Sequence, residues 1–337
     1  MKKTRFYVST IAIFILLHNK INFHLKVWTD ISSFNVKNPV ITIGAFDGVH
    51  LGHKFVLNQL NDIAGKVAGE SVVFTFHPHP VRVLHPEKEF VLLTTIEEKI
   101  ELIEEAGIKH LIIFPFTVEF SKLSYDEFVK TILVDKLHIN TMLSGYDNAV
   151  GKDKEGSYER LAELGAKYNF NIIRHEELKF SDEKISSTNI RNLLTRGKLL
   201  EASKILGYPY ILSGKVVHGQ RLGNKLGFPT ANIQPPENKF IPGNGVYAIT
   251  VEYNGIKYKG MMNIGVRPTV DADTRKPVIE AHLFDFKGNL YDEYIKINII
   301  RKLRNEFLFD SVEALRIQLK KDKQFALETL AEEFGIE

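Results

Sequence analysis

Residues 40–53 read VITIGAFDGVHLGH, and this stretch decides the fold. Residues 39–45 form a short apolar run rich in β-branched side chains, which predicts a buried strand. A turn that carries Asp47 and Gly48 follows, and apolar residues then recur at helical spacing from residue 50 to about residue 68. The sequence therefore predicts a strand, a turn and a helix in direct succession.

The alternation of strands and helices continues to about residue 174. Further strands are predicted at 71–76, 109–114, 141–144 and 171–174, and further helices after Thr94 and Thr95, at 124–137 and at 157–168. The helix after Thr95 is ended by Gly107 and has a charged face formed by Glu97, Glu98, Lys99, Glu101, Glu104 and Glu105. Such alternation predicts a Rossmann-like α/β domain, with a parallel sheet that is covered by helices on both faces.

The pattern changes after about Pro209. Closely spaced strands are predicted at 211–218, 245–253, 256–263, 278–286 and 294–301, with turn signals between them, and a final helix is predicted from Ser311 to about Glu333. This pattern predicts an antiparallel barrel or sandwich that ends in a helix. We place the boundary between a first domain, 23–206, and a second domain, 207–337.

The composition excludes several classes of protein. The 337 residues include 44% hydrophobic and 25% charged side chains, and the formal net charge of +3 is not gathered in a Lys/Arg block, so no nucleic-acid partner is expected. Without cysteine the chain forms neither disulfides nor a thiolate zinc site, which fits a reducing cytoplasm. The composition predicts no oligomeric state.

Residues 1–22 form an apolar extension that the rest of the sequence does not explain. Lys2, Lys3 and Arg5 precede an apolar run at 6–17, as in a signal peptide, but His18, Asn19 and Lys20 stand where small cleavage-site residues are expected. The run is also shorter than the roughly 20 apolar residues that span a bilayer. Three explanations of this extension remain open: a start assigned too far upstream, a signal or membrane anchor, and a disordered or docked tail. No firm membrane association is expected.

His50 and His53 are the first candidate site residues. They are three residues apart at a predicted helix start and therefore share one face. The free N–H groups of that helix end favour an anion such as triphosphate, and imidazoles can donate hydrogen bonds to its oxygens. Gly48 and Gly52 allow close approach of the backbone. A surface pair or half of a metal site is the alternative, but the strand, turn and helix around the pair favour phosphate.

A second phosphate-binding element is predicted at 185–191, ISSTNIR. Ser186, Ser187 and Thr188 stand at a helix start, and Arg191 is one turn further on. The hydroxyls, the backbone N–H groups and the guanidinium all suit a phosphate group. An ordinary N-cap with a solvated arginine remains the alternative.

These two motifs, with TFHPHP at 75–80, resemble the adenylyltransferase half of the bacterial bifunctional riboflavin kinase/FMN adenylyltransferases. The resemblance implies that the phosphate of FMN attacks the α-phosphorus of ATP in the presence of Mg²⁺ and that pyrophosphate leaves. It implies catalytic roles for His50, His53 and Arg191. It further implies ATP contacts by Gly44, Phe46, Asp47, Gly48, Gly52, Ser186, Ser187 and Thr188, and flavin contacts by His77, Pro78, Pro80 and Asp147.

One segment departs from the family pattern. Residues 145–152 read GYDNAVGK, and Asn148 and Val150 stand where the family has aromatic residues. Loss of one stacking partner for the flavin ring costs about 1 kcal/mol, or roughly fivefold in affinity. Alternatively, Val150 packs on the flavin ring, and no affinity for the flavin is lost. The departure leaves open a chain that phosphorylates riboflavin but does not adenylylate FMN.

The second domain lacks a P-loop, because G-x-x-x-x-G-K-[ST] does not occur. Residues 243–248, GNGVYA, fit a dinucleotide-binding pattern, but a strand follows them instead of a helix. Glycines at 219, 223 and 227 instead predict a loop that wraps phosphates. Thr230 and Asn232 supply oxygen ligands that suit Mg²⁺. A glycine-rich hairpin loop is the alternative.

The string GFPTAN at 227–232 is similar to the riboflavin kinase signature of the same family. The resemblance implies that Thr230 and Asn232 hold Mg²⁺ and ATP. It also implies that Glu280 accepts the proton of the ribityl 5′-hydroxyl as that group attacks the γ-phosphate.

Two assignments in the second domain have alternatives. Glu280 shares a strand face with His282 and Phe284, and a carboxylate there suits a general base, although a cross-strand salt bridge is the alternative. Arg304 is a candidate for contact with flavin or nucleotide, but it could instead pair with Glu306 on the surface.

The resemblance extends from about residue 23 to about residue 330. It implies a cytoplasmic transferase with ATP as co-substrate and with riboflavin, FMN and FAD as substrates and products. A kinase without adenylyltransferase activity and a flavin-binding protein without chemistry are the rival hypotheses.

Overall fold

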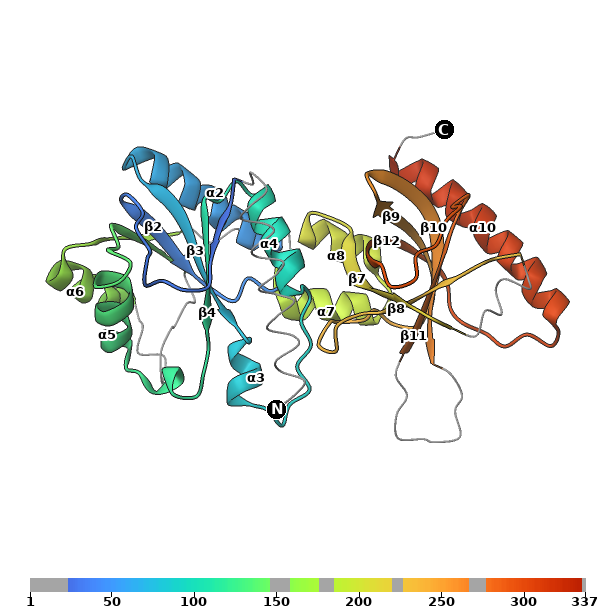
Figure 1. Ribbon diagram of the computed structural model, residues 1–337, viewed down its shortest axis with the longest axis horizontal. Coiled ribbons are helices and arrows are strands. Elements are labelled where there is room, and N and C mark those ends of the chain that lie inside the picture. Colours follow the sequence, from blue (N-terminus) through green and yellow to red (C-terminus); the bar gives the residue numbers. More distant parts are fainter. Residues whose placement is uncertain (1–23, 146–157, 176–184, 220–226, 267–276, 335–337) are drawn as a thin grey trace. The chain divides into compact units, whose positions relative to one another are not determined.

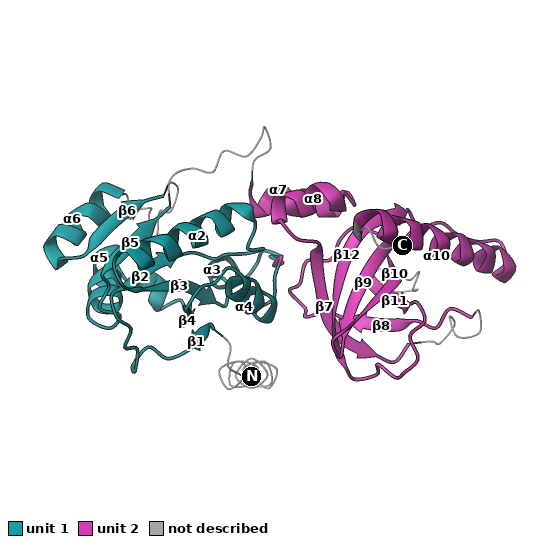
Figure 2. Cartoon of the chain, turned by 90° about the horizontal axis from the view of Figure 1, so that it is seen from above, with its two compact units in different colours: residues 1–90, 94–184 teal, residues 91–93, 185–337 magenta. Residues whose placement is uncertain are grey.

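The computed structural model describes residues 24–145, 158–175, 185–219, 227–266 and 277–334 (Figure 1). Packing divides the chain into two compact units, residues 1–90 with 94–184 and residues 91–93 with 185–337 (Figure 2). The extension at 1–22 lies outside the described residues, and within those residues no helix is both long and apolar enough to cross a bilayer.

The first unit contains the predicted parallel sheet. Its order is β1-β4-β3-β2-β5-β6, and every pairing is parallel. β3 lies on one side of β2 and β5 on the other, so the strand order reverses at β2. In such sheets ligands bind at the carboxyl ends of the strands beside the point of reversal. The strands are β1 (Lys26–Trp28), β2 (Pro39–Ile43), β3 (Glu70–His77), β4 (His110–Pro115), β5 (Thr141–Ser144) and β6 (Asn171–Arg174).

Helices cover both faces of this sheet, as the sequence predicts (Figure 1). One face packs against α5 (Tyr125–Phe128), the π-helical stretch Val129–Val134 and α6 (Tyr158–Tyr168). The other face is covered by α2 (Leu51–Lys66) and α4 (Ile96–Glu105). All five residues of β2 are buried, as expected for a strand covered on both faces.

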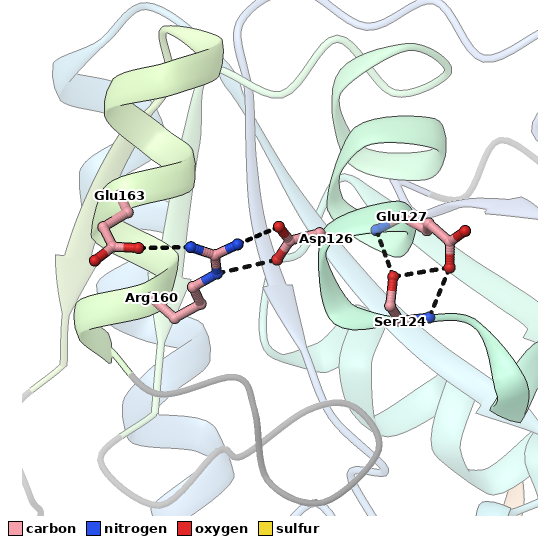
Figure 3. A network of polar contacts seen from close by, with 5 residues as sticks. All are labelled: Ser124, Asp126, Glu127, Arg160 and Glu163. Carbon is pink, nitrogen blue, oxygen red and sulfur yellow. Dashed lines mark hydrogen bonds and ion pairs between the residues drawn. The ribbon is translucent and has the colours of Figure 1, made fainter.

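Polar contacts join α5 to α6 at the surface of the first unit (Figure 3). The guanidinium of Arg160 binds the carboxylate of Asp126 with two nitrogens, and its third nitrogen donates to Glu163 at 2.6 Å. Ser124 caps α5, because its hydroxyl accepts from the backbone N–H of Glu127 while Glu127 accepts from the backbone N–H of Ser124. These contacts are exposed and lie outside the predicted site.

The second unit is built on a closed antiparallel barrel, in the order β10-β11-β8-β7-β12-β9. Ser311 caps the final helix through the N–H of Ala314, as predicted, and that helix packs on the outside of the barrel against Ala248, Met261 and Ile300. The elements are β7 (Tyr210–Val217), β8 (Ala231–Gln234), β9 (Gly245–Tyr253), β10 (Ile256–Val266), β11 (Pro277–Leu283), β12 (Tyr294–Arg304) and α10 (Val312–Phe334).

Two further helices belong to the second unit. α7 (Ser187–Thr195) and α8 (Leu199–Leu206) bury Ile190, Leu194 and Leu206 in the same hydrophobic cluster as the barrel interior. Residues 91–93 also join this unit, because Leu92 exchanges backbone hydrogen bonds with Asn238 and Phe240 at 2.7 and 2.8 Å. Packing thus divides the chain near residue 185, and the domain boundary predicted between residues 206 and 207 stays a prediction.

Several elements differ from the sequence prediction. β1, β8, α8 and the short helix α3 (Pro80–Leu84) were not predicted. The helix predicted at 124–137 is divided between α5 and the π-helical stretch. β11 ends at Leu283 instead of residue 286, and Asp285 beyond it adopts a left-handed φ of 57°.

Candidate active sites

The turn after β2 has a tight, left-handed backbone. Phe46, Gly48 and Val49 have φ values of 46°, 86° and 35°. A Cβ atom on Gly44 would lie only 3.0 Å from the ring of Phe46, so the turn closes on this glycine. The turn stands at the carboxyl end of β2, at the place where the sheet order predicts a ligand.

The start of α4 holds this turn in place. The carboxylate of Asp47 accepts a hydrogen bond from the backbone N–H of Thr94 at 3.2 Å, and the N–H of Gly48 donates to the hydroxyl of Thr94 at 3.1 Å. Asp47 was predicted as an ATP contact. Its buried carboxylate anchors the turn, and its predicted ATP contact stays a prediction.

His50 and His53 lie together at the start of α2, as predicted. Their rings stack with centroids 3.7 Å apart and planes inclined by 10°. His50 is the N-cap of α2, because its Nδ1 accepts from the backbone N–H of His53 at 3.3 Å. A neutral ring that accepts at Nδ1 carries its proton at Nε2, which is the donor that a phosphate oxygen needs.

Both rings are neutral near pH 7. Burial lowers the pKa of His50 to about 4, and burial, followed by the charges of His50 and Lys99, holds the pKa of His53 well below its ordinary value. Nδ1 of His53 is buried and has no hydrogen-bond partner among the described residues. The pair therefore offers hydrogen bonds to a ligand but no net charge.

Lys99 is a buried cation beside this turn, and its predicted place on a charged helix face is wrong. Its side chain is 5% exposed, and Nζ donates to the carbonyl oxygen of Ala45 at 2.6 Å. Burial lowers its pKa to about 8, while the charge of Asp47 raises it. The signal in the sequence was weak, because Lys99 stands among glutamates and its burial results from tertiary packing.

The residues predicted to bind flavin are only partly described. His77 ends β3 and is half-buried, and burial, followed by the charges of Lys99 and Arg82, lowers its pKa to about 4. Pro78 is exposed, and Pro80 begins α3. Asp147, like Asn148 and Val150, lies outside the described residues.

The predicted element at 185–191 belongs to the second unit. The hydroxyl of Ser186 caps α7 by accepting from the N–H of Asn189 at 3.2 Å, and Ser187 and Thr188 form the first turn. Nε of Arg191 donates to the carbonyl oxygen of Val91 at 3.1 Å. Arg191 therefore has a protein partner, and its predicted phosphate contact stays a prediction.

The barrel register brings three polar residues into one row. Glu280 on β11 lies opposite Asn232 on β8 and opposite Asn263 on β10. Directly opposed residues in antiparallel strands have Cβ atoms about 4.5–5.5 Å apart. Thr230 is two residues from Asn232 and is expected on the same side. The register thus places the predicted base next to the predicted Mg²⁺ ligands.

Gly219 gives the side chain of Asn232 its space. A Cβ atom on Gly219 would lie 2.0 Å from the amide nitrogen of Asn232 and 2.8 Å from its Oδ1. Gly227 adopts a left-handed φ of 80°, whereas Gly223 lies outside the described residues. The hydroxyl of Thr230 and the amide oxygen of Asn232 fit Mg²⁺, a hard cation that keeps several water or phosphate ligands.

Two cavities in the second unit share Thr230 in their lining. A cavity of about 190 Å³ lies between the outer barrel wall and α10, and its lining includes Glu280, Arg304 and Phe307. A second cavity of about 210 Å³ is lined by Thr230 together with residues of the 286–291 loop. Thr230 therefore lies at the border between the two cavities.

Arg304 lies at the first of these cavities but does not pair with Glu306. Its guanidinium binds the carboxylate of Asp322 on α10 and lies 4.6 Å from the ring centroid of Phe307. Glu306 instead accepts from the amide of Asn263 at 3.0 Å. The predicted alternative of a surface pair is wrong, because the partner of Arg304 comes from a helix 18 residues away.

Comparison with known proteins matches both parts of the chain. The family model described as FAD synthetase matches residues 33–189, and the riboflavin kinase model matches residues 206–330. A bifunctional riboflavin kinase/FMN adenylyltransferase of Listeria monocytogenes is 40% identical over 92% of this chain and 96% of its own length. The chain belongs to this family. Members of the family from Buchnera aphidicola of Schizaphis graminum and from Bacillus subtilis are 40% and 38% identical, over 85% and 86% of this chain and 92% and 91% of their own lengths.

A solved structure shares the fold of this riboflavin kinase/FMN adenylyltransferase family member. The crystal structure described as a macrolide-efflux protein from Streptococcus pneumoniae has a TM-score of 0.81 and 29% sequence identity. The similarity covers 90% of this chain and 98% of that one. The described activity of that protein differs from the family, so its similarity supports the fold alone.

Proposed function

We propose that this chain converts riboflavin to FMN in its second unit and FMN to FAD in its first unit, with ATP as co-substrate in both steps. The proposal is supported by membership of the family, by the histidine pair at the start of α2 in the first unit and by the row of Glu280 and Asn232 in the second. Its substrates are small molecules, and we propose that it works in the cytoplasm, where ATP is supplied.

The kinase step needs a base, an acceptor and a phosphate donor in contact. The carboxylate of Glu280 takes the proton of the ribityl 5′-hydroxyl, the hydroxyl oxygen bonds to the γ-phosphorus of ATP, and the bond to the β–γ bridging oxygen breaks to release ADP. We assign riboflavin to the cavity under α10, because Glu280 and aromatic side chains line it. We assign the nucleotide to the second cavity, with its phosphates directed toward Thr230.

Thr230 and Asn232 would hold Mg²⁺ in this site. A bound Mg²⁺ ion neutralises phosphate charge that develops in the transfer. The protein supplies the hydroxyl and amide oxygens, and the missing Cβ of Gly219 lets Asn232 keep its position. This assignment rests on the donor set and the space, not on an observed ion.

The adenylyltransferase step needs alignment instead of a base. A phosphate oxygen of FMN, already ionised at pH 7, bonds to the α-phosphorus of ATP, and the bond to the α–β bridging oxygen breaks to release pyrophosphate. His50 and His53 donate hydrogen bonds to phosphate oxygens from the start of α2.

The observation that carries the proposal is the barrel register. Pairing of Glu280 with Asn232 puts a carboxylate beside two oxygen ligands, and Thr230 lines both cavities. A barrel that had lost its chemistry would not need these residues together. Among the described residues no feature favours a chain that only phosphorylates riboflavin.

The test is a product assay. The purified protein is incubated with riboflavin, ATP and Mg²⁺, and the flavins are separated by chromatography. We expect FMN to appear first and FAD to follow. FMN without FAD would limit the function to the kinase, and unchanged riboflavin would contradict both activities.

A further inference from the structure

Lys99 occupies a position that is costly for a lysine. Its side chain is 5% exposed, and an ammonium group that is removed from water is stable only with compensating contacts. Burial lowers its pKa to about 8, so the group is still mainly charged at pH 7. The titratable groups that act on Lys99 or feel its charge are Asp47 in the turn after β2, His53 in the first turn of α2 and His77 at the end of β3.

Lys99 makes its compensating hydrogen bond with the turn after β2. The carbonyl oxygen of Ala45 accepts from Nζ of Lys99 at 2.6 Å and also from the hydroxyl of Thr75 at 3.3 Å. Ala45 directly precedes Phe46, where the chain enters its left-handed conformation. Orientation of the Ala45 carbonyl therefore sets the plane of the peptide from which the turn begins.

The residues at the start of α4 also bind the second half of the turn, at Asp47 and Gly48. Thr94 binds Asp47 and Gly48 through its backbone and its hydroxyl, and Thr95 is the N-cap of α4. Lys99 lies one turn further along α4. Contacts from one helix thus hold the turn at Ala45, Asp47 and Gly48, just before the histidine pair.

We propose that Lys99 is a positioning residue of the adenylyltransferase site, which holds the Ala45 carbonyl and so fixes the turn that carries His50 and His53. The inference rests on the proposed FMN adenylyltransferase activity of the first unit. It also supplies what the neutral histidines lack, because Lys99 brings a positive charge beneath the place where the triphosphate is expected. Lys99 acts through the turn and is not assigned a contact with substrate.

The experiment uses the full chain with Lys99→Met, which keeps the length of the side chain but removes the donor and the charge. Formation of FAD from FMN and ATP is measured, with riboflavin phosphorylation in the same sample as an internal control. Loss of a charge-assisted hydrogen bond predicts a fall in kcat of about 10- to 100-fold, with KM for FMN within about twofold of the wild type. Lys66→Met, at the exposed end of α2, is the matched control and should change neither rate.

Two readouts separate positioning from simple loss of fold. Trp28 is the single tryptophan of the chain and is buried in the first unit, so its fluorescence reports the folded fraction of that unit. The pH profile provides the second readout: wild-type adenylyltransferase activity should fall above a pH of about 8, where Lys99 loses its proton, and Lys99→Met should lack this limb.

Each outcome decides the inference. A folded Lys99→Met enzyme with a reduced kcat, normal kinase activity and no alkaline limb supports it. Wild-type kcat in Lys99→Met, or a loss that only follows the unfolded fraction, overturns it while the proposed function stands. A wild-type protein that makes no FAD from FMN overturns the proposed adenylyltransferase function itself, and the inference falls with it.

Discussion

Arg304 of β12 and Asp322 of α10 form a bidentate ion pair, with Nε and Nη2 of the arginine 2.9 and 2.7 Å from the two carboxylate oxygens. The side chains are 18% and 4% exposed, and the pair lies in the lining of the proposed riboflavin cavity. The pair therefore connects the last barrel strand to the helix that covers the cavity.

Removal of one partner should be costly. Asp322→Ala leaves the mostly buried charge of Arg304 without its carboxylate partner, and we expect a loss of about 3 kcal/mol in the free energy of unfolding together with a raised KM for riboflavin. Urea unfolding and kinase kinetics measure the two effects. Glu313→Gln removes an exposed partner of Arg316, 3.9 Å away, and should change both values little. Equal effects of the two variants would contradict the role of the buried pair.

Gly219→Ala tests the space around Asn232. The added Cβ would overlap the amide of Asn232, so we expect displacement of that side chain and a fall in kinase activity that higher Mg²⁺ concentrations partly restore. Gly65→Ala, where nothing lies within 4 Å of the new Cβ, should leave the kinase unchanged. Wild-type Mg²⁺ dependence in Gly219→Ala would show that Asn232 is not a metal ligand.

Lys239→Met tests the attachment of residues 91–93 to the second unit. Lys239 is 3% exposed, and its Nζ donates to the carbonyl oxygen of Leu93 at 2.6 Å and lies 4.7 Å from the ring centroid of Tyr210. We expect a loss of about 1–3 kcal/mol in thermal or urea unfolding, because the carbonyl loses a charged donor. Lys204→Met, on the exposed side of α8, should be neutral, and a similar loss there would contradict the assignment.

The stability of the first unit should fall in mild acid. His50 and His77 have folded-state pKa values of about 4, lowered mainly by burial, whereas an unfolded histidine titrates near 6.5. Between these values the unfolded chain binds more protons, so stability is fully present above pH 6.5 and is lost as the pH falls toward 4, by roughly 3 kcal/mol for each ring. Urea midpoints followed by circular dichroism at pH 7, 6 and 5 measure the loss, and a constant midpoint would contradict it.

The sequence predicted the repeated elements of the fold well, because they have clear periodicity. β5 and β6 have the predicted bounds, and the antiparallel register places Glu280 beside Asn232. The role of Lys99 could not be predicted, since a lysine between glutamates looks solvated until tertiary packing buries it. The Asp322 partner of Arg304 was equally hidden, because the contact depends on how α10 lies on the barrel.

The same limit applies to Asp47. A motif shows that a residue belongs near a site but not which atom it contacts, and its carboxylate binds the backbone of Thr94. Residues 185–191 were predicted within the first domain, yet α7 packs with the barrel through Ile190 and Leu194. Sequence spacing cannot reveal this, because the apolar face of a helix does not identify the surface that it covers.

The central claim is that one chain holds two separate chemical sites, and two variants test it most directly. Glu280→Gln and His50→Gln are each assayed with riboflavin and, separately, with FMN as the starting flavin, and the products are separated by chromatography. We predict that Glu280→Gln loses riboflavin phosphorylation by about 10²- to 10⁴-fold but still converts FMN to FAD, while His50→Gln accumulates FMN from riboflavin. Loss of both reactions in either folded variant, or wild-type rates of both reactions in Glu280→Gln, would contradict the account.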